Sequence, residues 1–159
     1  IDEANPSPGN MAGGLTTLTE KALGSVRKSG NGPIEGILAP GEVPRSKGLW
    51  LLDNPSLDPA SVAGMAAAGA QIVLFTTGRG TPIGSPICPV IKICASAEGW
   101  RRLPGHIDIN ITDIIESDAT IDSGADRIES LMYAVASGKV THAEAMGHRE
   151  FVMPQVGVL

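Results

Sequence analysis

The strongest constraint on the fold is a regular alternation of short apolar runs with amphipathic segments from residue 48 onward. Apolar runs with the length of buried β-strands occupy 48–53, 71–76, 90–94 and 106–109. Helices are predicted over 58–69, 98–103, 112–117 and 122–137, and a capping box opens a short final helix at 141–144. Strands that alternate with helices indicate an α/β fold, in which helices flank a parallel sheet.

The first 47 residues follow a different pattern, in which one helix lies between two loop-like segments. Thr17 and Glu20 have the spacing of a capping box, and an apolar stripe follows them, which predicts a helix. Proline, glycine and asparagine are frequent in 1–15 and in 30–47, so both segments are expected to be extended loops. The second includes a short extended stretch at 34–38. A loop of that length is usually functional or part of an interface.

Chain length sets the domain organisation. The 159 residues are enough for one domain with a core and too few for two ordinary domains, so 1–159 is expected to be a single α/β domain. Four strands are few for a self-sufficient doubly wound sheet, and the sequence begins at Ile1 instead of methionine. We therefore expect the chain to be part of a larger sheet domain.

Charge and composition exclude several function classes. The net charge is −5, whereas nucleic-acid-binding domains usually carry a basic footprint, so no nucleic-acid partner is expected. No apolar run approaches the roughly 20 residues of a membrane-spanning helix, and no membrane partner is expected. Two cysteines cannot form a disulfide framework, and no signal peptide is visible. The expected compartment is the cytoplasm.

The densest group of functional residue types follows the predicted strand 71–76. The carboxyl end of a strand in an open α/β sheet is where ligands bind. Two hydroxyls, two glycines that permit close backbone approach and a guanidinium together suit an anion; the residues are Thr76, Thr77, Gly78, Arg79 and Gly80. The competing interpretation is a tight turn with a solvated arginine. The segment is neither a Walker loop nor a complete dinucleotide fingerprint.

Three lysines and one glutamate are further candidates. Lys92 lies within a predicted strand, so it either points to solvent at a sheet edge or is buried with a carboxylate or ligand partner. Glu20, Lys21 and Lys28 lie on the first predicted helix, where their spacing alone favours a solvated charged face. The residues by themselves predict an anion-tolerant crevice in a parallel α/β domain and name no reaction.

Long motifs throughout the chain connect it with a known enzyme family. They are NPSPGN at 5–10, GGLTTL at 13–18, EKALGSVRKSG at 20–30, FTTGRGTP at 75–82, PVIK at 89–92, and the segment from ASGK to GHREF at 136–151. In these motifs the chain resembles the altronate/galactarate dehydratase family, which includes the large subunit of sulfolactate sulfo-lyase. The resemblance covers nearly the whole sequence and corresponds to the C-terminal part of the family's longer chain. It implies a Rossmann-like parallel sheet.

The resemblance also implies a function. Family members are lyases that remove water or sulfite from hydroxy-carboxylates, and the dehydratases are associated with ferrous iron. The expected activity is dehydration of a sugar acid of the altronate or galactarate type to a 2-keto-3-deoxy acid, performed by the full-length protein and not by the isolated chain. The implied partners are the sugar acid and the remainder of the chain or a companion subunit. The ligands of Fe²⁺ are expected to lie outside this segment.

The resemblance assigns roles to the candidate residues. The Thr76 and Thr77 hydroxyls, with Arg79 between Gly78 and Gly80, would hold the carboxylate or hydroxyls of the substrate. Lys92, Lys21 or Lys28 would supply positive charge or the base, and Glu20 would be a base or a partner to a metal ligand. Three alternatives stay open: a sulfolactate sulfo-lyase domain, a catalytically incomplete fragment that self-associates as a homodimer, and a nucleotide-binding module.

Overall fold

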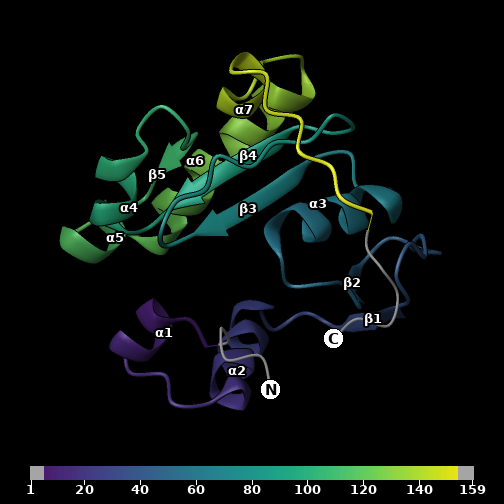
Figure 1. The fold of residues 1–159 in the computed structure, drawn as a ribbon, viewed down its shortest axis with the longest axis horizontal. Helices are drawn as coiled ribbons and strands as arrows, with labels where there is room; N and C mark the ends of the chain where they lie inside the picture. Colours follow the sequence, from purple (N-terminus) through teal and green to yellow (C-terminus); the bar gives the residue numbers. More distant parts are fainter. Residues whose placement is uncertain (1–5, 154–159) are drawn as a thin grey trace.

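A computed structural model describes residues 6–153 and forms an α/β fold (Figure 1). Five strands are described, each short: β1 (Ile34–Leu38), β2 (Leu49–Leu52), β3 (Val73–Thr77), β4 (Val90–Cys94) and β5 (Ile109–Asn110). The described helices are α1 (Pro8–Ala12), α2 (Leu18–Lys28), α3 (Asp58–Ala67), α4 (Ala97–Arg102), α5 (Asp113–Glu116), α6 (Ile121–Ala136) and α7 (His142–Ala145). The predicted order of strands and helices after residue 48 is confirmed.

All described strand pairs are parallel, as predicted, but the described strands form two sheets. The order β3-β4-β5 makes one sheet, with Thr77 of β3 opposite Cys94 of β4. The other sheet pairs β1 with β2. The expectation that the apolar run at 48–53 is a buried strand of one common sheet is therefore wrong. The extended stretch within 30–47 forms β1 and pairs with β2, and Leu49 and Leu51 remain exposed.

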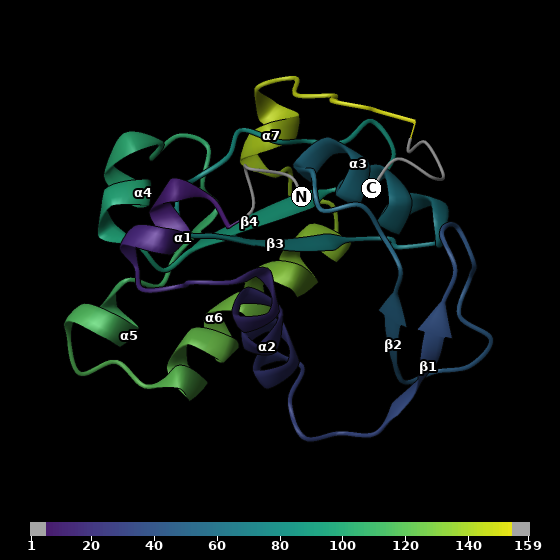
Figure 2. The same cartoon turned by 60° about the horizontal axis from the view of Figure 1, so that its bottom comes forward.

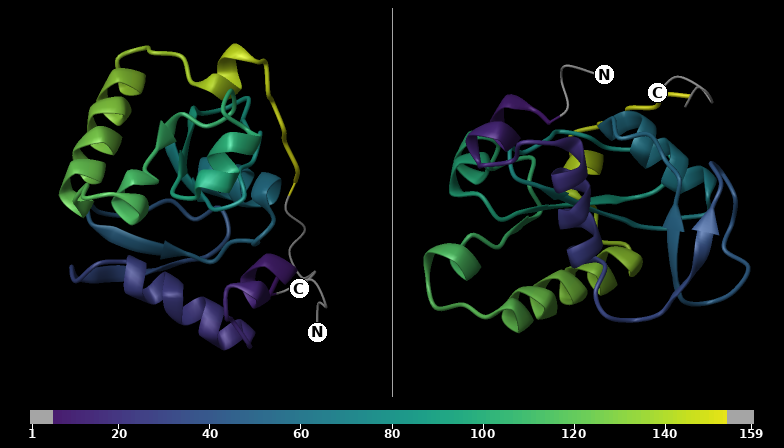
Figure 3. Two further views of the ribbon diagram at one scale, coloured as in Figure 1. Left: turned by 90° about the vertical axis from the view of Figure 1, so that its left-hand side faces the viewer. Right: turned by 90° about the horizontal axis from the view of Figure 1, so that it is seen from below.

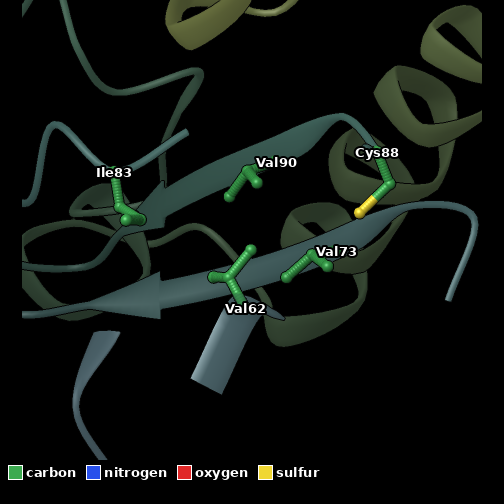
Figure 4. Close-up of a cluster of buried hydrophobic side chains, with 5 residues drawn as sticks. All are labelled: Val62, Val73, Ile83, Cys88 and Val90. Atoms are coloured by element: carbon green, nitrogen blue, oxygen red, sulfur yellow. The ribbon is translucent and has the colours of Figure 1, made fainter. Parts of the chain in front are cut away.

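The larger sheet has a core on each face, and β4 is buried at all five positions. One face carries the core of Val62, Val73, Ile83, Cys88 and Val90, which gather around β3 and β4 (Figure 4). On the other face, Ile91, Ile93 and Ile109 pack against Val135 of α6. Neighbouring residues of β4 alternate between the two cores, as the two-residue period of a strand requires. Helices on both faces are typical of parallel sheets.

Most local signals at helix ends act as predicted. Thr141 and Glu144 form the reciprocal capping box of α7. Gly69 and Gly138 adopt positive φ immediately after α3 and α6, where a residue without a Cβ is favoured. One expectation is wrong, because residues 8–12 of the expected loop form α1. Asp58 is the first residue of α3, and Leu57 is its N-cap. The expectation for residues 1–5 lies outside the described part of the chain.

The two N-terminal helices lie apart from α3 and α7. Figure 3 shows α1 and α2 along one side of the molecule, and Figure 2 shows α1 close to α4. These helices therefore lie near the end of the larger sheet at which β3 and β4 terminate. Among residues 6–153, no helix combines the length and apolar character needed to cross a membrane.

Candidate functional site

The candidate site is built on the turn that follows β3. The Thr77 hydroxyl accepts a hydrogen bond from the Gly80 backbone N–H at 3.0 Å, which closes the turn. Gly80 has a φ of +81°, a conformation that side chains with a Cβ rarely adopt. A Cβ on Gly99 of α4 would lie 2.5 Å from the Gly78 carbonyl oxygen. The turn can therefore lie against α4 only because Gly99 has no side chain.

Two hollows of about 350 Å³ each open at this end of the sheet. The first, which we name the lysine hollow, is lined by Lys28, Thr76, Thr77, Gly78, Ile93, Ala95 and Ile111. The second, the arginine hollow, is lined by Pro8, Gly9, Gly78, Arg79, Glu98, Gly99 and Arg102. The hollows share Gly78. The predicted anion-binding segment thus lies between two concave surfaces, each with cationic side chains.

Helix α2 turns its polar face toward the sheet. Lys21, Gly24 and Lys28 lie on one helical face by their spacing; Lys21 and Gly24 are half-buried, and Lys28 lines the lysine hollow. Within α2, all of whose residues are described, no residue is fully buried. The apolar side chains of this helix are mostly exposed: Leu18 at 54%, Leu23 at 57% and Val26 at 67%. The helix has the orientation opposite to that of an ordinary amphipathic surface helix.

Glu20 fixes the start of α2 and lines neither hollow. Its carboxylate accepts hydrogen bonds from the Thr16 backbone N–H at 2.9 Å and the Thr16 hydroxyl at 2.8 Å. The backbone hydrogen bond from Thr16 is the main reason that the pKa of Glu20 lies below its usual value. Thr17 caps the helix by accepting from the Glu20 N–H, as its position predicts. A lowered pKa is unfavourable for a general base near neutral pH.

Lys92 is fully buried, with 0% of its surface exposed, in the central strand β4. Its ammonium group donates to the carbonyl oxygens of Ile83 at 3.0 Å and Pro82 at 3.4 Å. Burial lowers the pKa of Lys92, and the charges of Asp108 and Glu150 oppose this shift. The buried alternative is therefore confirmed, but the hydrogen-bond partners are backbone carbonyls and not the expected carboxylate or ligand. Lys92 lines neither hollow and holds the segment that follows the Thr76–Gly80 turn.

The C-terminal GHREF motif also contacts the segment that follows the Thr76–Gly80 turn. The Glu150 carboxylate accepts from the Gly84 backbone N–H at 2.9 Å and is 3.0 Å from Nδ1 of His148. A Cβ on Gly84 would lie 2.5 Å from the His148 carbonyl oxygen, so the two segments are in close contact. Sequence reasoning did not single out Glu150, Gly99 or Arg102. Glu150 lies in the GHREF motif, but no sequence pattern near it indicates that it binds the backbone of Gly84.

Replacing Glu150 with glutamine is expected to make stability less dependent on acid pH. Burial raises the pKa of Glu150, but hydrogen bonds from Gly84, its own backbone and His148 outweigh that effect and leave the pKa below its usual value. A carboxyl with a lowered folded-state pKa stabilises the fold above its unfolded pKa and loses that contribution as pH falls through the folded value. The Tm difference between wild type and Glu150→Gln should therefore be largest at pH 6–7 and should shrink as the pH falls below the usual glutamate pKa and through the lower folded-state value. A pH-independent difference would contradict this.

Gly99→Ala is expected to disturb the turn directly. Its Cβ would meet the Gly78 carbonyl, the Cys94 sulfur and the Arg79 backbone carbon, and backbone atoms cannot yield cheaply. Overpacking of this kind costs about 1–3 kcal/mol in free energy of unfolding. The matched control is Gly24→Ala in α2, where a Cβ meets nothing within 4 Å and helix propensity gains up to about 1 kcal/mol. Denaturant unfolding of both variants checks the contrast, and equal stabilities would contradict it.

The described residues offer no site for the iron that the resemblance implies. Between residues 6 and 153, no group of three or more His, Cys, Asp or Glu side chains is placed to hold a metal ion. Cys88 and Cys94 are buried free thiols that pack in the core. Burial raises the pKa of the Cys88 thiol, which disfavours the metal-binding thiolate. The donor set present therefore does not fit a resident iron ion.

Comparison with known proteins connects this geometry with an enzyme family. The family described as "D-galactarate/Altronate dehydratase, C-terminal" matches residues 1–159. The chain is 38% identical over 98% of its length to "(2R)-sulfolactate sulfo-lyase subunit beta" of Chromohalobacter salexigens, covering 40% of that protein. It is 41% identical to "Altronate dehydratase" of Bacillus subtilis, over 97% of this chain and 31% of the relative. It is also 41% identical to "Galactarate dehydratase (L-threo-forming)" of Escherichia coli, over 86% of this chain and 26% of the relative.

The share of each relative that is covered defines the scope of the similarity. The chain spans between about a quarter and two fifths of the length of these curated relatives. The relatives named are lyases, and the family match extends over every residue of the sequence. The chain therefore belongs to the D-galactarate/altronate dehydratase family and corresponds to its C-terminal domain.

Proposed function

We propose that the full-length protein is a hydro-lyase that dehydrates a sugar acid of the altronate or galactarate type to a 2-keto-3-deoxy acid. In this proposal the present chain supplies one wall of the substrate site. The observation that carries the proposal is the lysine hollow. Lys28 and the Thr76–Gly78 segment, about 50 residues apart in sequence, line this one hollow at the sheet edge where α/β folds bind ligands. Family membership supports the choice of reaction.

The chemistry of such a dehydration explains why cations are needed. A base removes the proton from the carbon next to the carboxylate, and the electron pair left behind forms the carbon–carbon double bond. The bond to the neighbouring hydroxyl breaks, and that oxygen leaves as water after it takes up a proton. The resulting enol then tautomerises to the keto acid. Negative charge accumulates on the carboxylate during proton removal, so donors and cations fixed beside it lower the barrier.

The residues of this wall divide these tasks. The Thr76 and Thr77 hydroxyls and the backbone around Gly78 bind the substrate carboxylate or hydroxyls, and Lys28 stabilises the developing charge. Lys21 lies on the same face of α2 and adds positive charge to this wall. The site residues that lie elsewhere act indirectly: Lys92 positions the segment after the turn, and Glu20 fixes the start of α2. No residue of this chain is assigned as the base.

Ferrous iron belongs to this proposal only as a component held elsewhere. Since the donors described here do not fit a metal ion, we propose that residues outside the described part of the chain bind it.

The remainder of the protein is proposed to cover the exposed apolar face of α2. Leu18, Leu23 and Val26 are its exposed apolar side chains. A mostly exposed apolar stripe on a helix marks an interaction surface. The relatives contain three fifths or more of their length beyond the matched region, which provides a covering surface within one longer chain or in a companion subunit. Self-association of two copies through the same face is the alternative.

A sulfolactate sulfo-lyase is the second candidate function. The similarity to the subunit beta of such an enzyme over 98% of this chain favours it. The same wall would bind the carboxylate, and sulfite would leave in place of hydroxide. The fold and the proposed residue roles are unchanged, so only substrates can separate the two candidates.

Activity of the full-length protein tests the proposal. Anaerobic assays with Fe²⁺ should follow 2-keto acid formation from altronate and galactarate, and sulfite release from sulfolactate. Lys28→Gln is expected to reduce kcat/KM by about 10²-fold or more, as for the loss of one preorganised donor. Arg27→Gln is the matched control, because Arg27 is the preceding exposed residue of α2 and lines neither hollow. Turnover of none of the three acids would refute the proposed function.

A further inference from the structure

The arginine hollow lies next to the lysine hollow. The proposed reaction assigns roles to residues of the lysine hollow and leaves Arg79 and Arg102 of the arginine hollow without one. Arg79 and Arg102 both line the arginine hollow, one from the turn after β3 and the other from the last turn of α4. Glu98 is the acidic residue of its lining, so the hollow carries more positive than negative charge. Its volume of about 350 Å³ equals that of the lysine hollow and suffices for a small anionic group with its hydroxyls.

The pairing of Arg102 with Glu98 leaves the guanidinium available. Nη1 of Arg102 lies 3.7 Å from Oε1 of Glu98, and the two side chains are 62% and 77% exposed. Exposed ion pairs four residues apart on a helix contribute little to stability. An incoming carboxylate can form two parallel hydrogen bonds with a guanidinium, which is a stronger and shorter contact. A bound anion can therefore displace Glu98 from Arg102 at little cost.

The two hollows adjoin at Gly78, which lines both. Gly78 is exposed, and even a Cβ at this position would meet nothing within 4 Å. No side chain of residue 78 separates the hollows. A ligand that occupies the lysine hollow with one end can pass over this residue and reach the arginine hollow with the other.

We propose that the arginine hollow binds a second anionic group of the substrate, so that the enzyme acts on hydroxy acids with an anionic group at each end. Arg102, with Arg79, then determines specificity for a dianionic acid over a monoanionic one. This inference rests on the proposed function. Aldaric acids such as galactarate have this charge pattern, and so does sulfolactate. Altronate, with one carboxylate, lacks the second group.

The test compares Arg102→Gln with Arg101→Gln in the full-length protein. Arg101 is the adjacent exposed arginine of α4 and does not line the hollow. We expect Arg102→Gln to weaken galactarate binding, measured by calorimetry, by about tenfold or more, equivalent to about 1.4 kcal/mol. KM for galactarate should rise to match, with kcat less affected, whereas altronate binding and the Arg101→Gln variant should be unchanged. Sulfolactate should follow galactarate if its sulfonate occupies the same hollow.

The possible results separate the dianion inference from the proposed reaction. An equal effect of Arg102→Gln on galactarate and altronate, or no effect on either, would overturn the dianion inference even in an active enzyme. Weakened binding of the dianions alone would support the inference even if none of the acids is turned over, and in that case the proposed reaction fails while the binding site stands.

Discussion

Arg79→Ala in the full-length enzyme is expected to lower kcat/KM for the sugar acid by about 10²–10³-fold. Arg79 lines the arginine hollow and follows directly after Gly78, which lines both hollows, so its guanidinium lies where an anionic substrate at this edge can reach it. Its removal eliminates a charge-assisted contact that no neighbouring backbone N–H replaces. Because the side chain is exposed, Tm should stay within a few degrees of the wild-type value. Steady-state kinetics and a thermal melt check both statements.

A matched arginine provides the control for that experiment. Arg45 is exposed in the loop before β2, forms an ion pair with Glu42 and lines neither hollow. Arg45→Ala should leave kcat/KM unchanged. If Arg79→Ala also keeps wild-type kcat/KM, the turn after β3 does not bind substrate, and the solvated-arginine interpretation of the sequence is the correct one.

Lys92→Ala is expected to lower the free energy of unfolding by about 2–5 kcal/mol. The change removes a buried side chain and leaves the carbonyls of Pro82 and Ile83 without their donor. Lys92→Met should cost less, because methionine fills similar volume and no longer requires burial of a charge. Burial already lowers the pKa of Lys92, which reflects that cost.

Denaturant titration of the two Lys92 variants separates packing from hydrogen bonding. A larger loss for alanine than for methionine is expected, and equal losses would contradict the packing argument. Both variants should also reduce activity, because Lys92 positions the segment that follows the Thr76–Gly80 turn. The effect on KM should be larger than the effect on kcat. An unchanged KM in a folded Lys92→Met enzyme would show that the ammonium does not position this segment.

Signals within a few residues were sufficient to predict much of the fold. The strand β4 and the helix α6 were predictable from the sequence, because the apolar residues of each element are the ones that it buries in the core. The capping box at Thr141 and the glycines at 69 and 138 mark helix ends for local reasons of hydrogen bonding and backbone conformation. These features need no knowledge of distant parts of the chain.

Long-range pairing was beyond the sequence patterns. The extended stretch at 34–38 looks like part of a loop because three prolines surround it, and only its pairing with β2 makes it a strand. Likewise, the stripe of Leu18 and Val26 predicts a helix but not which face meets the sheet. An apolar stripe ordinarily faces the core, and here it faces outward, so the spacing rule alone predicts the wrong exposure for Lys21.

The site shows the same division. Thr76 to Gly80 were identifiable because a dense group of anion-binding types follows a strand. Arg102 was not identifiable, because Arg101 and Arg102 are adjacent at the end of a helix and the sequence does not distinguish them. Only the position of α4 beside the turn shows that Arg102 lines the arginine hollow. The partners of Lys92 were also hidden, because backbone carbonyls ten and nine residues earlier carry no sequence signature.

The most direct test is a crystal structure of the full-length protein with galactarate bound under non-turnover conditions. The ligand should lie at the carboxyl end of β3, with one carboxylate within hydrogen-bond distance of Lys28 or the hydroxyls of Thr76 and Thr77. Galactarate bound at a site to which none of these residues contributes would contradict the assignment of this sheet edge as the sugar-acid site.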